Sequence, residues 1–199
     1  MNTADASLIL KNTIRTIHED TRKEIKPNIY RGHSRSISTD IEDNITLFIS
    51  NVLPDNFKFL VDSSVRLVGR SKRPDLLITN QLNEVVAMIE VKSNMGYCRD
   101  ASGVIDSIIE NDNSFRDLNK FTCKFSFDEN QEVTYSENVK LFLISLTDGN
   151  CSQNNHINNK EYSRMNGVGY FCLFNGWYGD LSDHEIIEFA EELKTTCQL

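Results

Sequence analysis

Two acidic residues and one lysine stand out in this 199-residue sequence, because carboxylates and an ammonium brought together could bind a metal ion or an anionic substrate. Asp75 is followed after fourteen residues by Glu90, and Lys92 comes two positions later. The segment 85–89 is apolar throughout, which is typical of a strand in the interior of a sheet. A carboxylate and an ammonium therefore emerge at the carboxyl end of a buried strand. Burying an ionised group without a partner costs several kcal/mol, so these charges need one another or a ligand.

The turn at residues 80–83 predicts how the two carboxylates meet. It joins a strand over 75–79 to a strand over 85–92 in an antiparallel hairpin, so Asp75 should lie near Glu90. Neighbouring carboxylates repel each other, and Mg²⁺ removes that conflict because it takes oxygen ligands, often one or two carboxylates plus waters. The residues predict a Mg²⁺ site with Lys92 within reach of a metal-bound water or an anionic substrate.

Strand alternation predicts which side chains accompany this site. Successive side chains point to opposite faces of a sheet, so Val86, Met88, Glu90 and Lys92 are expected on one face. A less specific interpretation stays open, in which Asp75 only begins a strand and the charged pair is a solvated strand end.

A third acid is expected from a helix. Capping residues at 38–40 and the apolar spacing that follows predict a helix that ends before Pro54. At about 100° per residue, Glu42 lies at the margin of the core-facing stripe, whereas Asp43 faces water. Glu42 could therefore approach the same site.

Together these motifs resemble the PD-(D/E)xK, or restriction-endonuclease-like, nuclease superfamily. The segment Pro74-Asp75, followed by Glu90-Val91-Lys92, is similar to the motif that names the family. Residues 39–146 resemble its core, which is a helix, a three-stranded meander, a second helix and a fourth strand. The resemblance implies a mixed central β-sheet flanked by helices.

The resemblance also implies roles for individual residues. Asp75, Glu90 and the main-chain carbonyl of Val91 would bind Mg²⁺, with Mn²⁺ as a substitute. Lys92 would orient or activate the attacking water, and Glu42 is the position that matches the helix acid of many members. The implied activity is phosphodiester hydrolysis, by an endonuclease rather than an exonuclease, with DNA as the preferred nucleic acid. Type II restriction enzymes often work as dimers, so a homodimer stays an open alternative.

Six further residues are candidates for contact with nucleic acid, with solvated loops or turns as the alternative for each group. Four precede the first carboxylate and two follow the lysine: Arg66, Arg70, Lys72, Arg73, Tyr97 and Arg99. The net charge of −8 does not exclude such a contact, because charges beyond about 8–10 Å are screened at physiological salt.

The distribution of charge supports a different class of function as an alternative. Residues 1–100 carry 14 basic and 13 acidic residues, whereas residues 101–199 carry 7 and 16. The acidic half would repel a duplex lying across it. A catalytically inactive domain of the same fold, which binds nucleic acid or a protein, therefore remains open.

The helices and strands that carry these residues are expected to form one mixed α/β domain over 1–199. We expect helices over 7–25, from 41 to before Pro54, around 104–109 and over 183–194. Strands are expected over 57–61 with 65–68 as its continuation, and over 75–79, 85–92, 139–146 and 169–174. The polar segments 111–137 and 148–167 are expected to be loops. The first helix and the segment 169–194 would be additions to the core.

The remaining features indicate a cytoplasmic protein that does not enter a membrane. No apolar run approaches the roughly 20 residues that cross a bilayer, and residues 1–7 do not have the pattern of a secretory signal. The five cysteines are scattered without a CxxC pair, so we expect reduced thiols rather than a disulfide framework or a zinc site.

Overall fold

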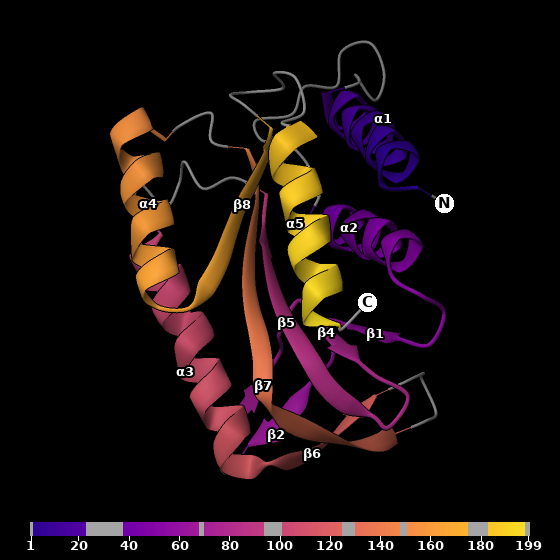
Figure 1. The fold of residues 1–199 in the computed structure, drawn as a ribbon, viewed down its shortest axis with the longest axis vertical. Helices are drawn as coiled ribbons and strands as arrows, with labels where there is room; N and C mark the ends of the chain where they lie inside the picture. Colours follow the sequence, from indigo (N-terminus) through magenta and orange to yellow (C-terminus); the bar gives the residue numbers. More distant parts are fainter. Residues whose placement is uncertain are drawn as a thin grey trace, which may run out of the picture.

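A mixed β-sheet with helices on both faces forms the centre of the computed structural model, which describes residues 2–22, 38–67, 70–93, 101–124, 130–147, 151–174 and 183–197. Helices α1 (Thr3–Arg22), α2 (Ser38–Val52) and α5 (Asp183–Thr196) cover one face. Helices α3 (Ser102–Leu118) and α4 (Gln153–Met165) lie along the other (Figure 1). The α/β class predicted from the sequence is therefore confirmed.

The main sheet has the order β1-β4-β5-β7, and the far edge of β7 pairs first with β6 and then with β8. Its strands are β1 (Lys58–Val61), β4 (Leu76–Thr79), β5 (Glu84–Lys92), β6 (Lys120–Lys124), β7 (Asn130–Thr147) and β8 (Val168–Phe174). Strands β1, β4 and β5 are antiparallel neighbours, whereas β5, β7 and β8 are parallel. The carboxyl ends of these three parallel strands therefore lie at the same edge of the sheet.

Strand β5 lies between β4 and β7, which explains its apolar sequence. Ala87, Ile89 and Val91 pack into the core beneath α1, α2 and α5, while Met88 packs into the core beneath α3. Both faces of the strand are covered, so polar side chains would be costly except at its ends. The prediction of an interior strand joined to β4 as a hairpin is confirmed.

A β-bulge at Val86 corrects the predicted alternation of side chains. In the pairing with β4, Ile78 lies opposite Ala87 but Thr79 lies opposite Val85, so Val86 is skipped. Val86 consequently packs against the same core as Ala87 rather than sharing a face with Met88. Glu90 and Lys92 come after the bulge, so their relation to one another is unchanged.

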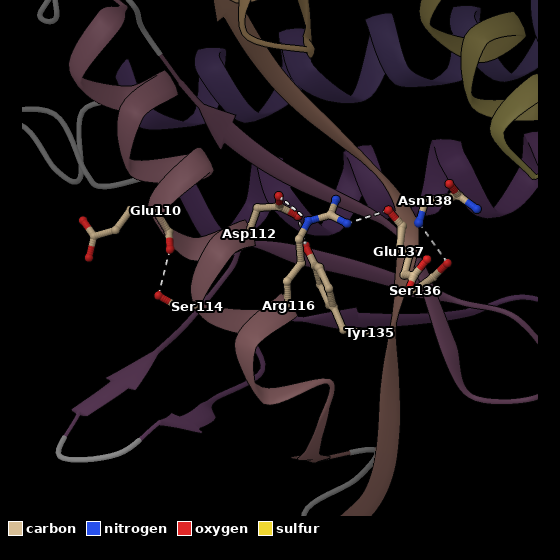
Figure 2. A network of polar contacts seen from close by, with 8 residues as sticks. All are labelled: Glu110, Asp112, Ser114, Arg116, Tyr135, Ser136, Glu137 and Asn138. Carbon is tan, nitrogen blue, oxygen red and sulfur yellow. Dashed lines mark hydrogen bonds and ion pairs between the residues drawn. The ribbon is translucent and has the colours of Figure 1, made fainter.

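A second irregularity lies in β7, where a polar network joins it to α3 (Figure 2). Between Tyr135 and Lys140 the strand has more residues than the facing segment of β5. Arg116 of α3 donates through Nε to Asp112 Oδ2 at 2.7 Å and through a terminal guanidinium nitrogen to the Glu137 carbonyl at 2.5 Å. The Tyr135 hydroxyl donates to Asp112 Oδ1 at 2.9 Å. These bonds hold the bulged backbone of β7 against α3. They also satisfy the carboxylate of Asp112, which is only 7% exposed.

The prediction of loops over 111–137 and 148–167 was wrong for the described parts of both segments, which are mostly helix and strand. Helix α3 continues to Leu118, and both β6 and the first part of β7 lie in the first segment. Helix α4 occupies most of the second, and its buried residues are Asn159 and Ser163. Asn159 accepts from the Ala101 N–H at 3.1 Å, and Ser163 donates to the Val168 carbonyl. In α4, hydrogen bonds therefore replace the apolar periodicity by which a helix is recognised.

Residues 65–67 also differ from the prediction. They do not continue the first strand but form β2 (Val65–Leu67), which pairs with β3 (Arg70–Lys72) in a separate two-stranded sheet. The other predicted elements are present with shifted ends, and residues 23–25 of the first predicted helix lie outside the described residues. Among the described helices, none is long and apolar enough to cross a membrane. Four cysteines lie in the described ranges, and none of them is joined in a disulfide.

Candidate active site

Asp75 and Glu90 lie side by side where β4 begins and β5 ends. The neighbouring pair Leu76 and Ile89 are cross-strand partners, so the hairpin register places the two acids next to each other. The Lys92 ammonium lies 2.5 Å from Glu90 Oε1 and 4.0 Å from Asp75 Oδ2. Both carboxylates are therefore on the same side of the sheet and share one cation. The structure brings these three residues together as the hairpin pattern predicts.

Burial makes Asp75 an unusual carboxyl group. Its Oδ2 accepts a 2.7 Å hydrogen bond from the Val91 N–H. Its pKa is raised to about 7, first by burial and then by the charge of Glu90, against the opposing effects of the Val91 hydrogen bond and of Lys92. The ionised form of Asp75 is therefore disfavoured, and further positive charge nearby would stabilise it.

Glu42 approaches the same group from α2. It is half-buried, and its pKa is raised by burial and by the charge of Asp62, while Lys92 lowers it. Glu90 raises the pKa of Glu42, and Glu42 in turn raises that of Asp75. The helix acid is thus within electrostatic range of the two strand acids, which agrees with its predicted place at the margin of the core-facing stripe.

Asp62 is a neighbour that sequence reasoning missed. It follows β1 directly with a φ of 47°, and its N–H donates to the Asp75 carbonyl at 2.9 Å. Its carboxylate accepts from an Arg73 guanidinium nitrogen at 2.6 Å. An Asp directly after an apolar strand was the available signal, because Asp tolerates left-handed backbone at turns. Asp62 connects β1 to the start of β4 and adds negative charge beside Glu42.

The four predicted basic contacts are distributed over the β2–β3 hairpin and the residue after it. Lys72 pairs with Glu110 of α3 at 3.4 Å, and Arg73 pairs with Asp62, so both already have acidic partners. Arg66 is exposed on β2. Arg70 lies on β3, but its side chain is outside the described part, as are Tyr97 and Arg99 altogether.

The donor set fits a hard cation by its chemistry. Mg²⁺ favours carboxylate and main-chain oxygens, which the predicted ligands Asp75, Glu90, Val91 and Glu42 supply. In the described ranges, however, no three His, Cys, Asp or Glu side chains are grouped so that they could hold a metal ion. The Lys92 ammonium instead supplies the positive charge that the carboxylates require, and it is the Val91 N–H that contacts Asp75. A cation bound by both carboxylates would have to compete with this ammonium.

We found no match to this chain among models of known protein families, among curated proteins or among solved structures. The geometry of the site and the order of the elements therefore carry the functional argument.

Proposed function

We propose that this chain is a Mg²⁺-dependent endonuclease that hydrolyses phosphodiester bonds, with DNA as the preferred substrate. The observation that carries the proposal is the pair of carboxylates, Asp75 and Glu90, held around the single ammonium of Lys92 at the end of an interior strand. Such a site combines oxygen ligands for a cation with a fixed positive charge beside them, which is what attack on a phosphodiester requires.

The chain order of the elements supports a restriction-endonuclease-like core. Helix α2, the antiparallel strands β1, β4 and β5, helix α3 and the parallel strand β7 follow one another as in the family's helix, meander, helix and strand. The β2–β3 hairpin and β6 are insertions into that order. Helix α2 contributes Glu42, and the meander contributes Asp75 and Glu90. The family resemblance implies the same sources for these acids.

Each residue has a chemical role in this proposal. Asp75 and Glu90 would hold Mg²⁺, with the Val91 carbonyl and Glu42 as further oxygen donors. When bound, the metal supplies polarisation of the phosphate and a lowered pKa for water. The Lys92 ammonium, released from Glu90, would position the attacking water or stabilise the negative charge that develops on the phosphoryl oxygens.

Cleavage assays with matched variants test this function. Asp75→Asn and Glu90→Gln should abolish cleavage of double- or single-stranded DNA in Mg²⁺ or Mn²⁺, and Lys92→Ala should remove most turnover while Mn²⁺ still binds in calorimetry. Asp55→Asn and Glu161→Gln are the controls, because Asp55 is exposed after the end of α2 and Glu161 is exposed on α4, and they should retain full activity. Robust cleavage by Glu90→Gln would refute the proposal.

A second candidate is a domain of the same fold that binds without cleaving. The absence of a three-ligand metal group in the described ranges and the close Lys92–Glu90 pair favour it. The wild-type chain would then bind DNA, RNA or a protein, leave nucleic acids intact in Mg²⁺ and Mn²⁺, and bind no Mn²⁺ in calorimetry.

A further inference from the structure

A partly open hollow of about 600 Å³ lies between β2 and the β6–β7 hairpin. Its lining comes from β2 and the residue before it, from β6 and from the start of β7: Ser64, Arg66, Lys120, Phe121, Thr122 and Asn130. Phe121 is the single apolar residue in this set. Two cations therefore come to the hollow from separate elements, accompanied by two hydroxyl groups and an amide.

The chemistry of this lining suits a phosphate backbone better than a small organic ligand. Small-molecule sites are mostly apolar and enclose their ligand, whereas this hollow is partly open and its lining is more polar than apolar. Arg and Lys, with Ser, Thr and Asn, are the side chains that contact phosphate oxygens in complexes with nucleic acids. Arg66 can offer paired N–H donors to one phosphate, and Lys120 can offer a point charge to the same or the next phosphate.

The hollow begins close to the candidate active site. Ser64 is two residues after Asp62, whose N–H donates to the Asp75 carbonyl. Two residues of extended chain span about 7 Å, so this wall of the hollow adjoins the backbone that carries Asp75. A strand whose phosphate lies at Asp75 and Glu90 can therefore continue past Ser64 toward Arg66.

The charges around the hollow are available to a ligand. Lys120 is paired with Glu132 at 3.4 Å, but both side chains are more than half exposed. Such surface ion pairs stabilise a protein little, so a phosphate can replace the carboxylate as the partner of Lys120. Acidic residues more than about 8–10 Å away are screened at physiological salt, so the overall charge of the second half does not prevent this contact.

We propose that this hollow binds the phosphate backbone of a nucleic acid, through Arg66 and Lys120, with Thr122 and Asn130 as neutral donors. This proposal rests on the proposed function and extends it, because a nucleic-acid strand bound in the hollow would lead to Asp75 and Glu90. Lys120, Thr122 and Asn130 lie in the acidic half of the chain, where no contact with a polyanion was predicted.

Fluorescence anisotropy with a short labelled DNA, as single strand and as duplex, tests the proposal in EDTA, where no cleavage occurs. Arg66→Ala and Lys120→Ala should each weaken binding about tenfold and each lower the slope of log K against log salt by about one. Glu132→Gln should tighten binding two- to threefold, because it releases Lys120. Arg164→Ala removes an exposed charge of α4 and should change neither quantity beyond the general effect of net charge.

The outcomes separate this proposal from the proposed function. Binding that responds to Arg164→Ala as strongly as to Arg66→Ala and Lys120→Ala, in variants with unchanged circular dichroism, would overturn the hollow as a specific site even if the protein cleaves DNA. Loss of binding in these two variants, together with tighter binding by Glu132→Gln, supports it even if the wild-type protein shows no cleavage. Unchanged or weaker binding by Glu132→Gln would overturn the role of Lys120.

Discussion

Replacing Asp75 by Asn should make the protein more stable at alkaline pH, because the native fold disfavours the ionised form of this carboxyl group. The pKa of Asp75 is raised from 3.8 to about 7, mainly by burial and by the charge of Glu90. An acid whose pKa is raised by folding contributes stability that is present below the unfolded pKa and is lost as the pH rises through the folded pKa. The window of loss therefore extends from about pH 4 to about pH 7.

The size of the effect follows from that shift. About three pKa units correspond to roughly 4 kcal/mol at 1.36 kcal/mol per unit, which is an upper value. The Asp75 side chain is 20% exposed, and its Val91 hydrogen bond can be kept by an Asn carbonyl oxygen, so we expect a gain of about 2 kcal/mol at pH 8. At pH 3.5 the difference between Asp75→Asn and wild type should be close to zero.

Urea denaturation in EDTA at pH 3.5, 5, 7 and 8 measures this difference. Asp55→Asn is the control, since Asp55 is exposed, and its difference from wild type should not change with pH. An Asp75→Asn variant that is less stable than wild type at pH 8, or whose difference from wild type is the same at every pH, would refute the argument. Such a result would mean that the burial of Asp75 is compensated by contacts that an amide cannot make.

Three other substitutions give independent checks on the structure. Lys92→Met should raise the pKa of Asp75 further, since the ammonium lowers it, and carboxyl-carbon NMR titration would detect the change. Arg116→Ala should cost about 2–3 kcal/mol of unfolding free energy in urea, because it leaves the buried Asp112 carboxylate without its guanidinium partner. A cost below about 0.5 kcal/mol would contradict the stabilising role of this ion pair. Gly167→Ala should cost about 1 kcal/mol of unfolding free energy in the same assay, because φ is +71° there, although an added Cβ would meet no atom within 4 Å. A gain in stability would contradict the left-handed backbone conformation at Gly167.

Several elements were predictable because the evidence for them is local. The two apolar runs joined by residues 80–83 specify the β4–β5 hairpin, and the hairpin register brings Asp75 beside Glu90. The apolar stripe of α2 likewise predicted the side on which Glu42 lies. The roles of these residues in metal binding and catalysis stay predictions, since they rest on chemistry that a cleavage assay must test.

Other features depend on partners far away in the sequence. Asp112 is a buried polar residue of α3 in a segment predicted as a loop, and the Tyr135 hydroxyl of β7 is the distant partner that donates to its carboxylate. Helix α4 was missed for the same reason, since Asn159 and Ser163 face inward with hydrogen-bond partners from other elements. The bulge at Val86 is likewise set by the register with β4 and β7 rather than by the residue itself.

Local patterns in the sequence were sufficient to predict the α/β class, the interior strand and the meeting of two carboxylates with a lysine, because strand and turn patterns act over a few residues. The contacts that bring Asp62 beside this site, and Arg66 and Lys120 around one hollow, are seen only in the folded structure. Those contacts join β1 to β4 and β2 to β6, and the pairing of distant segments is fixed by packing of the whole sheet rather than by any local pattern.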